Sequence, residues 1–120
     1  MPYFAVVREQ GPAWDYARDR REQSKWDEHA GYMDALEADG FFLFAGPLDG
    51  GPRILSIVDA PDPATIRRRL DDDPWTPMGL LRIVSIEPWD ALVGGGTLDR
   101  MRAGAAERRA RRDSNPRSCG

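Results

Sequence analysis

The sequence predicts a single α+β domain in which strands and helices follow one another in the order β-α-β-β-α-β. Three observations support this fold class. Short β-branched and aromatic runs recur four times, two segments between them carry apolar residues at the spacing of a helix, and glycine- and proline-rich pairs separate the segments. At 120 residues, with 41% hydrophobic and 31% charged residues, the chain has room for one core and an ordinary globular composition.

The first half of the chain predicts a strand, a loop, a helix and a second strand. Residues 3–8 form a short aromatic and β-branched run that a Gly-Pro pair ends. Residues 14–24 are crowded with charge and lack an apolar stripe, so we expect a long loop or a loosely docked turn. Ser24 is a suitable N-cap for a helix over residues 25–39, which a glycine follows. The continuous apolar run 41–45 predicts a strand buried on both faces.

The second half predicts a strand, a helix and a last strand. The strand covers residues 53–58, and the helix opens at Asp62 or Pro63 and stops at Asp73, directly before a proline. The last strand covers residues 80–86. This order is the ferredoxin-like βαββαβ arrangement, an antiparallel four-stranded sheet with two helices on one face.

The other face of that sheet also needs a cover. The expected strands 41–45, 53–58 and 80–86 are apolar at consecutive positions, so both of their faces carry large apolar side chains. A large apolar patch is a liability on a monomer. A second copy, packed sheet against sheet under two-fold symmetry, would cover it. We therefore expect a homodimer.

The C-terminal segment differs from the rest in composition. Three consecutive glycines precede Thr97, and Leu98 and Met101 are the last large apolar side chains. We therefore expect residues 1–93 to form the domain and residues 94–120 to be a flexible basic tail whose loss leaves folding intact.

Charge and cysteine content restrict the partners and the compartment. From Thr97 onward seven arginines face three acidic residues, so this segment carries +4 and the body −7 of the net charge of −3. An acidic body is a poor platform for nucleic-acid phosphates, and no apolar run approaches the roughly 18 residues of a membrane span. The N-terminus lacks the pattern of a signal peptide, and Cys119 is the only cysteine. We expect a cytoplasmic protein with no nucleic-acid or membrane partner.

The topology gathers several chemically useful residues at one end of the sheet. The start of the first helix, the end of the second strand and the end of the second helix all lie there, and the loop 14–24 leads into the same end. The residues expected at this end are His29, Gly46, Pro47, Asp73, Trp75 and Trp14.

His29, the only histidine, lies on the same helix face as Trp26 and Met33. One interpretation is a core histidine bonded to a backbone carbonyl. The other starts from Asp73, because a carboxylate at a helix C-terminus opposes the helix dipole and favours a compensating partner. A carboxylate bonded to one ring nitrogen fixes the tautomer and leaves the other nitrogen free for proton transfer. His29 and Asp73 are therefore the candidate catalytic residues.

The remaining candidates are substrate-binding residues. Gly46 and Pro47 are better interpreted as a turn than as an anion-binding site, because no helix N-terminus follows them. Trp14 and Trp75 are core or dimer residues by default, but they could form the walls of a pocket. A single histidine and the lack of clustered cysteines make a metal site an unattractive hypothesis, and we expect no metal and no cofactor.

Over about residues 3–93 the chain resembles the YciI-like (YCII-related) domain family. Three pieces carry the resemblance, in this order: DEHAGYMDALEADG with its histidine, FFLFAGPL at a strand end, and DDDPW before the last strand with IVSIEPW after it. The resemblance implies a dimeric α/β barrel similar to muconolactone-isomerase-type proteins, with a His–Asp active site at His29 and Asp73. At least one member of the family is a dehydrochlorinase of a chlorinated hydroxyquinol that uses no metal or organic cofactor. The loop 14–24 and the arginine-rich tail depart from the shorter family pattern.

Two main function hypotheses follow. The first is a cofactor-independent lyase or isomerase, dehydrochlorinase-like, in which His29 moves a proton on a small cyclic or aromatic metabolite and Asp73 orients the ring. The alternative is a non-catalytic module of the same fold that binds a small ligand or a partner. A third hypothesis is a cofactor-free oxygenase of related barrels. The fold hosts all of them and does not decide between them.

Overall fold

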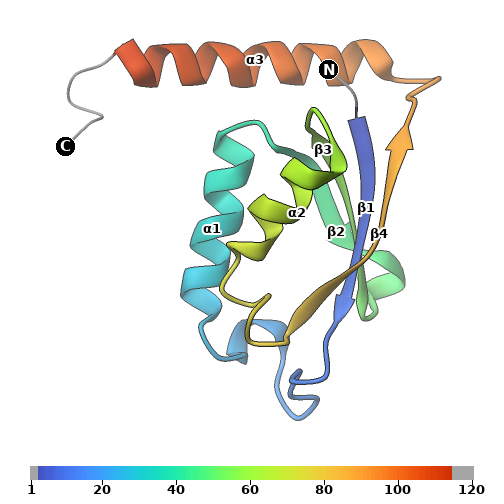
Figure 1. Cartoon of the computed structure of the whole chain (residues 1–120), viewed down its shortest axis with the longest axis vertical. Coiled ribbons are helices and arrows are strands. Elements are labelled where there is room, and N and C mark those ends of the chain that lie inside the picture. Colours follow the sequence, from blue (N-terminus) through green and yellow to red (C-terminus); the bar gives the residue numbers. More distant parts are fainter. Residues whose placement is uncertain (1–2, 115–120) are drawn as a thin grey trace.

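The computed structural model describes residues 3–114 and contains a four-stranded antiparallel sheet with helices α1 and α2 on one face (Figure 1). The strands are β1 (Tyr3–Gln10), β2 (Phe42–Pro47), β3 (Arg53–Asp59) and β4 (Leu81–Trp89). The longer helices are α1 (Trp26–Ala38), α2 (Pro63–Asp71) and α3 (Gly95–Ser114), and single 3₁₀ turns form η1 (Arg20–Glu22) and η2 (Leu48–Gly50). The strand order β2-β3-β1-β4 confirms the predicted α+β, ferredoxin-like fold.

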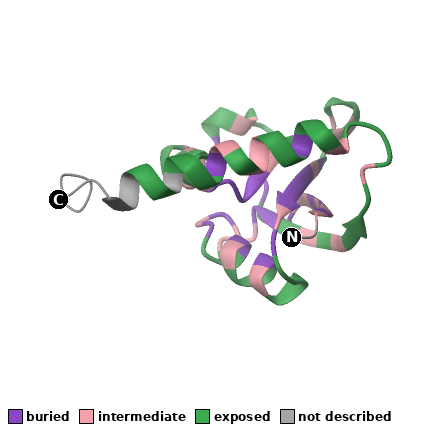
Figure 2. Cartoon of the chain, turned by 90° about the horizontal axis from the view of Figure 1, so that it is seen from above, coloured by how far each residue is buried: buried purple, intermediate pink, exposed green. Residues whose placement is uncertain are grey.

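The core lies between the sheet and the two helices. Alternate β1 side chains, Phe4, Val6 and Arg8, are buried, and Phe4 and Val6 belong to this core with residues of α1 and α2. A second buried cluster, built around Trp14 and Trp75, closes one end of the sheet. Figure 2 shows buried residues gathered around the sheet while most of α3 is exposed. Arg8 is therefore a charged residue at a position where its neighbours on the same face are apolar.

Local signals set the ends of both docked helices, with one exception. The Asp62 side chain accepts a hydrogen bond from the Thr65 amide at 2.7 Å and caps α2, which begins at Pro63, one of the two predicted starts. Gly40, with a φ of 84°, follows α1 in the left-handed conformation that glycine adopts without strain. The expected N-cap role of Ser24 is wrong, because Lys25 occupies the N-cap position without a side-chain bond. The Ser24 carbonyl instead accepts a hydrogen bond from Trp75 Nε1.

The charged loop before α1 is packed rather than loosely docked. Gln23 is buried inside it, and Nε2 of Gln23 donates to the carbonyls of Asp15 at 2.8 Å and Arg18 at 3.0 Å. The Asp15 amide donates back to Gln23 Oε1 at 3.1 Å. One buried amide therefore satisfies several backbone groups, and this polar frame replaces the apolar stripe that we expected a docked segment to need.

The segment predicted as a flexible tail is a helix up to Ser114. α3 crosses the end of the sheet, with Leu98 and Ala105 buried two turns apart on one face (Figure 1). Asp99 accepts a hydrogen bond from the Tyr3 hydroxyl at 2.6 Å, and Arg102 pairs with Asp59 at 3.1 Å. The expectation failed because docking uses one leucine, one alanine and polar contacts rather than a broad apolar stripe. The remaining part of the predicted tail, including Cys119, lies outside the described residues.

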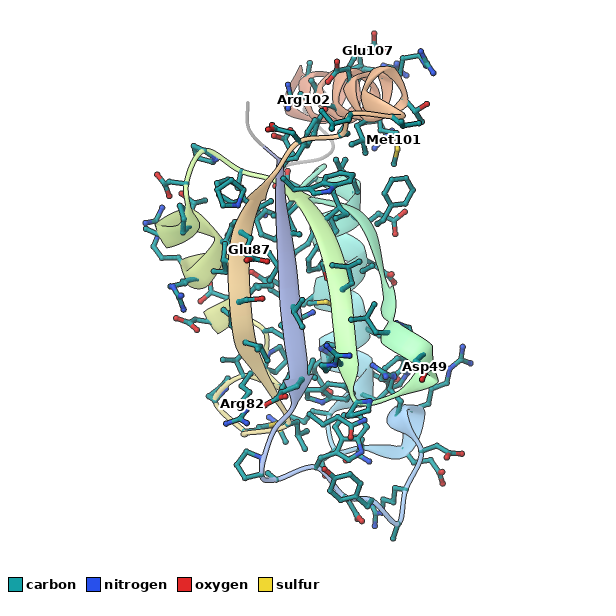
Figure 3. The ribbon with its side chains drawn as sticks, turned by 90° about the vertical axis from the view of Figure 1, so that its right-hand side faces the viewer. Asp49, Arg82, Glu87, Met101, Arg102 and Glu107 are labelled. Carbon is teal, nitrogen blue, oxygen red and sulfur yellow. The ribbon has the colours of Figure 1, made fainter. Side chains whose placement is uncertain are left out.

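The second face of the sheet carries no helix within residues 3–114, and Figure 3 looks onto it. β2 is an edge strand, and the side chain of Phe44 is 53% exposed, so the expected burial of this strand on both faces is wrong for the chain by itself. Covering of this face by a second copy stays a prediction. Among the described residues, no helix has the length and apolar character needed to cross a membrane.

Candidate active site

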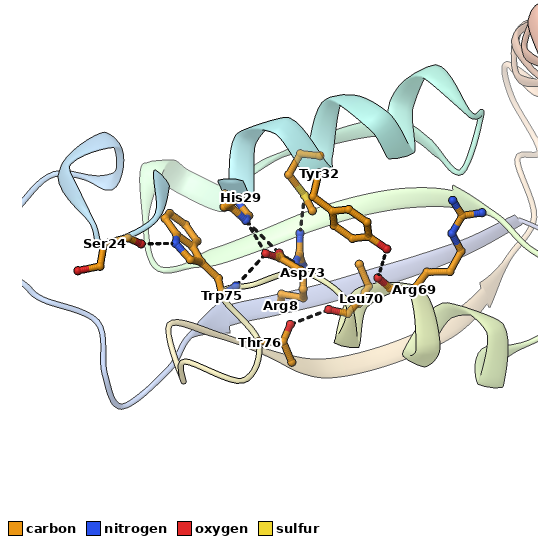
Figure 4. A network of polar contacts seen from close by, with 10 residues as sticks. Arg8, Ser24, His29, Tyr32, Arg69, Leu70, Asp73, Trp75 and Thr76 are labelled. Carbon is orange, nitrogen blue, oxygen red and sulfur yellow. Dashed lines mark hydrogen bonds and ion pairs between the residues drawn. The ribbon is translucent and has the colours of Figure 1, made fainter. Parts of the chain in front are cut away.

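His29 and Asp73 lie in direct contact. His29 stands in the first turn of α1, and Asp73 follows the end of α2, so the fold brings together residues 44 positions apart. Nδ1 of His29 is 2.9 Å from both carboxylate oxygens of Asp73. The exposed fractions are 6% for His29 and 0% for Asp73. The pair that topology suggested is therefore formed inside the protein (Figure 4).

Two further donors hold the carboxylate of Asp73. Nη1 of Arg8 donates to Oδ2 at 3.0 Å, and the Trp75 amide donates to Oδ1 at 3.0 Å. Burial by itself raises the pKa of a carboxyl group. The hydrogen bonds from His29 and Trp75, together with the nearby positive charge of Arg8, outweigh burial and lower the pKa of Asp73. Asp73 is thus a buried carboxylate that stays ionised at neutral pH.

The imidazole ring is fixed in orientation as well as in position. It stacks on the indole of Trp75 with a centroid distance of 3.8 Å and an interplanar angle of 4°. Trp26 lies against it in a tilted arrangement at 5.8 Å. Because the Asp73 carboxylate is an acceptor, we assign the proton to Nδ1, which leaves the lone pair on Nε2. Within residues 3–114, Nε2 makes no hydrogen bond.

A cavity of about 300 Å³ lies between α1 and β2, and this volume is at the lower end of the range for small-molecule sites. Among the residues that line it are His29, Arg8, Arg20, Trp26, Met33 and Phe42. His29 therefore lines a space that a small ring compound could occupy. This combination of a cavity, a histidine and an ionised carboxylate suits proton transfer.

The cavity contains only some of the expected substrate-binding residues. Gly46 and Pro47, at the end of β2, line it with His29, and their binding of a substrate stays a prediction. Trp75 and Trp14 do not line it, so their predicted role as pocket walls is wrong. Trp75 is fully buried behind the imidazole, and Trp14 packs edge-on against Trp75 at 5.6 Å. Trp75 thus supports the imidazole directly by stacking, and Trp14 supports Trp75.

Comparison with known proteins now identifies the family. A family model for the YCII-related domain matches residues 1–90. The chain belongs to the YCII-related domain family. The matched region contains His29, Asp73 and all four strands, whereas α3 follows it. No curated protein sequence matches the chain.

Among solved structures, this YCII-related protein is similar to 5-chloro-2-hydroxyhydroquinone dehydrochlorinase from Burkholderia phenoliruptrix AC1100, in complex with 2,5-dihydroxybenzoquinone. The TM-score is 0.51 and the sequence identity is 19%, and the match covers 73% of this chain and 93% of the other. At this identity the similarity shows a shared fold.

Sequence reasoning missed Arg8 as part of the YCII-related site. Arg8 is 3% exposed, lines the cavity and ties β1 to Asp73 across 65 positions of sequence. A signal was present, because Phe4, Val6 and Arg8 alternate along one strand and two of the three are apolar. A charged residue at an inward position requires a partner, and the only candidates are buried polar groups of other elements.

Arg20 is the second residue that was missed. It belongs to η1 in the loop before α1, and it lines the same cavity as His29. Arg82, an arginine of β4, instead forms an ion pair with Glu9 of β1. Within the described part of the chain, no group of three or more histidine, cysteine, aspartate or glutamate side chains could hold a metal ion.

Proposed function

We propose that this YCII-related protein is an enzyme that moves a proton on a small cyclic compound, with His29 as the general base and acid. One observation carries the proposal. Asp73 occupies Nδ1 of His29, while the other ring nitrogen has no hydrogen bond within residues 3–114 and the residue lines a cavity. In a buried imidazole held in this way, Nδ1 fixes the ring through its hydrogen bond, and Nε2 is left for proton transfer.

The chemistry follows from the orientation of the ring. Nε2 takes a proton from a C–H or O–H group of the substrate, and the electron pair of the broken bond moves into the substrate. In an isomerase, His29 returns the proton to a different atom of the same molecule. In a lyase, the electron pair expels a leaving anion such as chloride, and His29 passes the proton to water. Either course requires only the imidazole and its supporting residues.

Arg8 and Trp75 serve this chemistry through Asp73. Arg8 and the Trp75 amide hold the two oxygens of the carboxylate, so the acceptor for Nδ1–H cannot rotate away. The face of the Trp75 indole keeps the imidazole plane fixed. These residues do not act on the substrate themselves; they fix the direction of the Nε2 lone pair.

The substrate class of the proposal is a small ring. The cavity volume suits one, and the similar dehydrochlorinase of known structure acts on a hydroxylated, chlorinated ring. The same cavity in a protein without turnover would be a ligand-binding module. The two functions differ in whether a bound ring exchanges its protons.

The test measures proton exchange directly. Hydroxylated aromatic rings and cyclic enones are incubated with the protein in D₂O, and deuterium incorporation is followed by mass spectrometry; 5-chloro-2-hydroxyhydroquinone is also assayed for chloride release. We expect His29→Gln to lower the rate about 10²–10⁴-fold. Asp73→Asn should lower it less, because the amide oxygen still accepts from Nδ1–H.

Asp72→Asn is the matched control, since Asp72 is exposed and neighbours Asp73 in sequence. It should leave the exchange rate unchanged. A His29→Gln variant with the full rate would contradict the proposal. Rings that bind to the wild type without any exchange would favour the binding module.

A further inference from the structure

Arg20 places a positive charge on the wall of the cavity. Its guanidinium lies 5.8 Å from the centre of the Trp14 ring, and the residue is half-buried. Within residues 3–114 it has no carboxylate partner in an ion pair. Burial lowers the pKa of Arg20, but a guanidinium stays charged at neutral pH. A half-buried cation without a counterion can bind an anionic group.

The loop that carries Arg20 is built to hold it in place. The buried Gln23 side chain binds the carbonyls of Asp15 and Arg18 on the preceding turn. The Asp19 amide donates to Glu22 Oε1 at 3.2 Å and closes η1 on itself. Because these bonds fix the backbone on both sides of Arg20, its position on the cavity wall costs little further ordering when a ligand binds.

Two cations share this end of the cavity. Burial lowers the pKa of Arg8, and the charge of Arg20 lowers it further, while Asp73 acts in the opposite direction. Within residues 3–114, Asp73 is the one carboxylate that forms an ion pair with Arg8, and it also accepts a hydrogen bond from His29. With a neutral imidazole, Arg8, Arg20 and Asp73 together carry one excess positive charge.

The acidic residues of the cavity lie further along α1. Asp34 and Glu37 line it too, and both are exposed. Glu37 follows His29 by eight residues, which is about 12 Å along a helix. An anionic group is therefore attracted at the Arg20 end and repelled at the Glu37 end, so the charges would orient a bound molecule as well as attract it.

We propose that the cavity takes small ring compounds that carry an ionised oxygen, such as a carboxylate, enolate or phenolate, and that Arg20 binds this oxygen. The inference rests on the proposed function for the reaction, in which His29 moves a proton on the ring that Arg20 holds. It adds the substrate class and a binding residue in a loop that the sequence marked as unusual.

Binding of benzoate and its neutral counterpart benzamide tests the anion requirement without a known substrate. The Cε1–H resonance of His29, the only histidine, reports occupancy of the cavity by nuclear magnetic resonance at about 150 mM salt, where interactions of distant surface charges are screened. We expect benzoate to bind at least tenfold more tightly than benzamide. Arg20→Gln should weaken benzoate binding about 10- to 100-fold, as expected for loss of a charged hydrogen bond, and leave benzamide unchanged. Arg20→Lys should restore part of the affinity.

Arg21→Gln is the matched control, because Arg21 is the exposed neighbour in η1 and does not line the cavity. It makes the same change of charge and should leave benzoate binding within about twofold, as for a screened surface charge. Equal binding of the two probes, equal loss in the two variants, or no shift of the His29 resonance with either probe would overturn the inference.

The outcomes separate this inference from the proposed function. Arg20-dependent benzoate binding, together with no proton exchange on any ring compound, would retain the anion site and reject the catalytic proposal. Exchange on neutral rings at the same rate in wild type and Arg20→Gln would retain the catalytic proposal and reject the anion site.

Discussion

Asp73 is the described residue whose ionisation connects most directly to the stability of the site. His29, Arg8 and the Trp75 amide all donate to its carboxylate, and Asp73 is fully buried. Breaking such a cluster on one side leaves the other charge without compensation, which is the costly case for buried ion pairs. Protonation of this carboxylate at low pH should therefore lower the stability of the protein.

The folded-state pKa of Asp73 is lowered relative to an unfolded-state value near 3.9. Its ionised form therefore contributes stability that is fully present above about pH 4 and is lost as pH falls through the lower folded-state pKa. Thermal unfolding between about pH 2 and 7 measures this. Asp73→Asn should be less stable than wild type at pH 7 and should lose less stability in acid. Asp72→Asn should follow the wild-type curve, and parallel curves for all three proteins would contradict the assignment.

The sequence was informative about the two candidate catalytic residues, His29 and Asp73, and less so about the residues that support them. His29 and Asp73 could be paired because strand and helix directions alone place them at the same end of the sheet. The positions of Trp14 and Trp75 depend on which side of the imidazole the indoles pack, and topology does not specify this. Arg20 reaches the cavity through a loop whose path depends on the hydrogen bonds of Gln23, and residue types alone do not determine such a path.

Among the secondary-structure elements, the junction between β1 and β4 depends on a glycine. The Gly11 amide donates to the Leu80 carbonyl at 2.9 Å, and a Cβ at Gly11 would lie 2.2 Å from the carbonyl oxygen of Gly79. We expect Gly11→Ala to lower the free energy of unfolding by about 1–3 kcal/mol, as overpacking typically does. Urea denaturation measures the change.

Gly31→Ala is the control for that experiment. Apart from its chain neighbours and the backbone of its own helix, a Cβ at Gly31 would meet no atom within 4 Å, and the residue lies inside α1. Alanine there should stabilise the protein by about 0.5–1 kcal/mol, because it restricts the unfolded chain. A Gly11→Ala variant as stable as wild type would show that the backbone at Gly79 can move.

α3 should contribute to stability through a single large side chain. Leu98 is buried against the body, so Leu98→Ala should lower the free energy of unfolding by roughly 2 kcal/mol, at the low end for buried leucines because the site lies at the surface. Leu92→Ala, at a side chain that is 93% exposed, should change it by less than about 0.5 kcal/mol. Equal effects of the two changes would mean that α3 does not dock on the body in solution.

The helix was missed for a reason that concerns its sequence. Between Thr97 and Ser114 the chain has strong helix formers and few large apolar residues. An apolar stripe this short gives too weak a periodic pattern to predict a docked helix. Leu98 and Ala105 are seven residues apart, and the polar contacts of Asp99 and Arg102 complete the interface. α1, α2 and the four strands were predicted because each carries its own periodic pattern and its own turn residues.

For the whole molecule, the uncovered sheet face predicts self-association. Its side chains include Val7, Leu55 and the exposed Phe44, and no element within residues 3–114 packs on them. Light scattering at micromolar concentration should give twice the chain mass of 13.5 kDa. Leu55→Glu should shift the protein to the monomer mass, since it places a charge in the middle of that face.

Ala35→Glu is the control, because Ala35 is exposed on α1, away from the sheet. It should leave the assembly unchanged. A wild-type protein that scatters as a 13.5 kDa monomer would contradict the homodimer.

The sequence distances within the site have a consequence for how the protein folds. Asp73 contacts a residue 44 positions away and another 65 positions away, so the cluster joins β1, α1 and the segment after α2. Closing such long loops is entropically slow, and contacts of this kind form late unless the rest of the sheet has already brought the segments together. We expect the tryptophan fluorescence, to which Trp75 contributes with three other tryptophans, to return to its native value at the same rate as the whole sheet forms. A nascent or partly folded chain would then lack the contact between His29 and Asp73, which would form only in molecules that have finished folding.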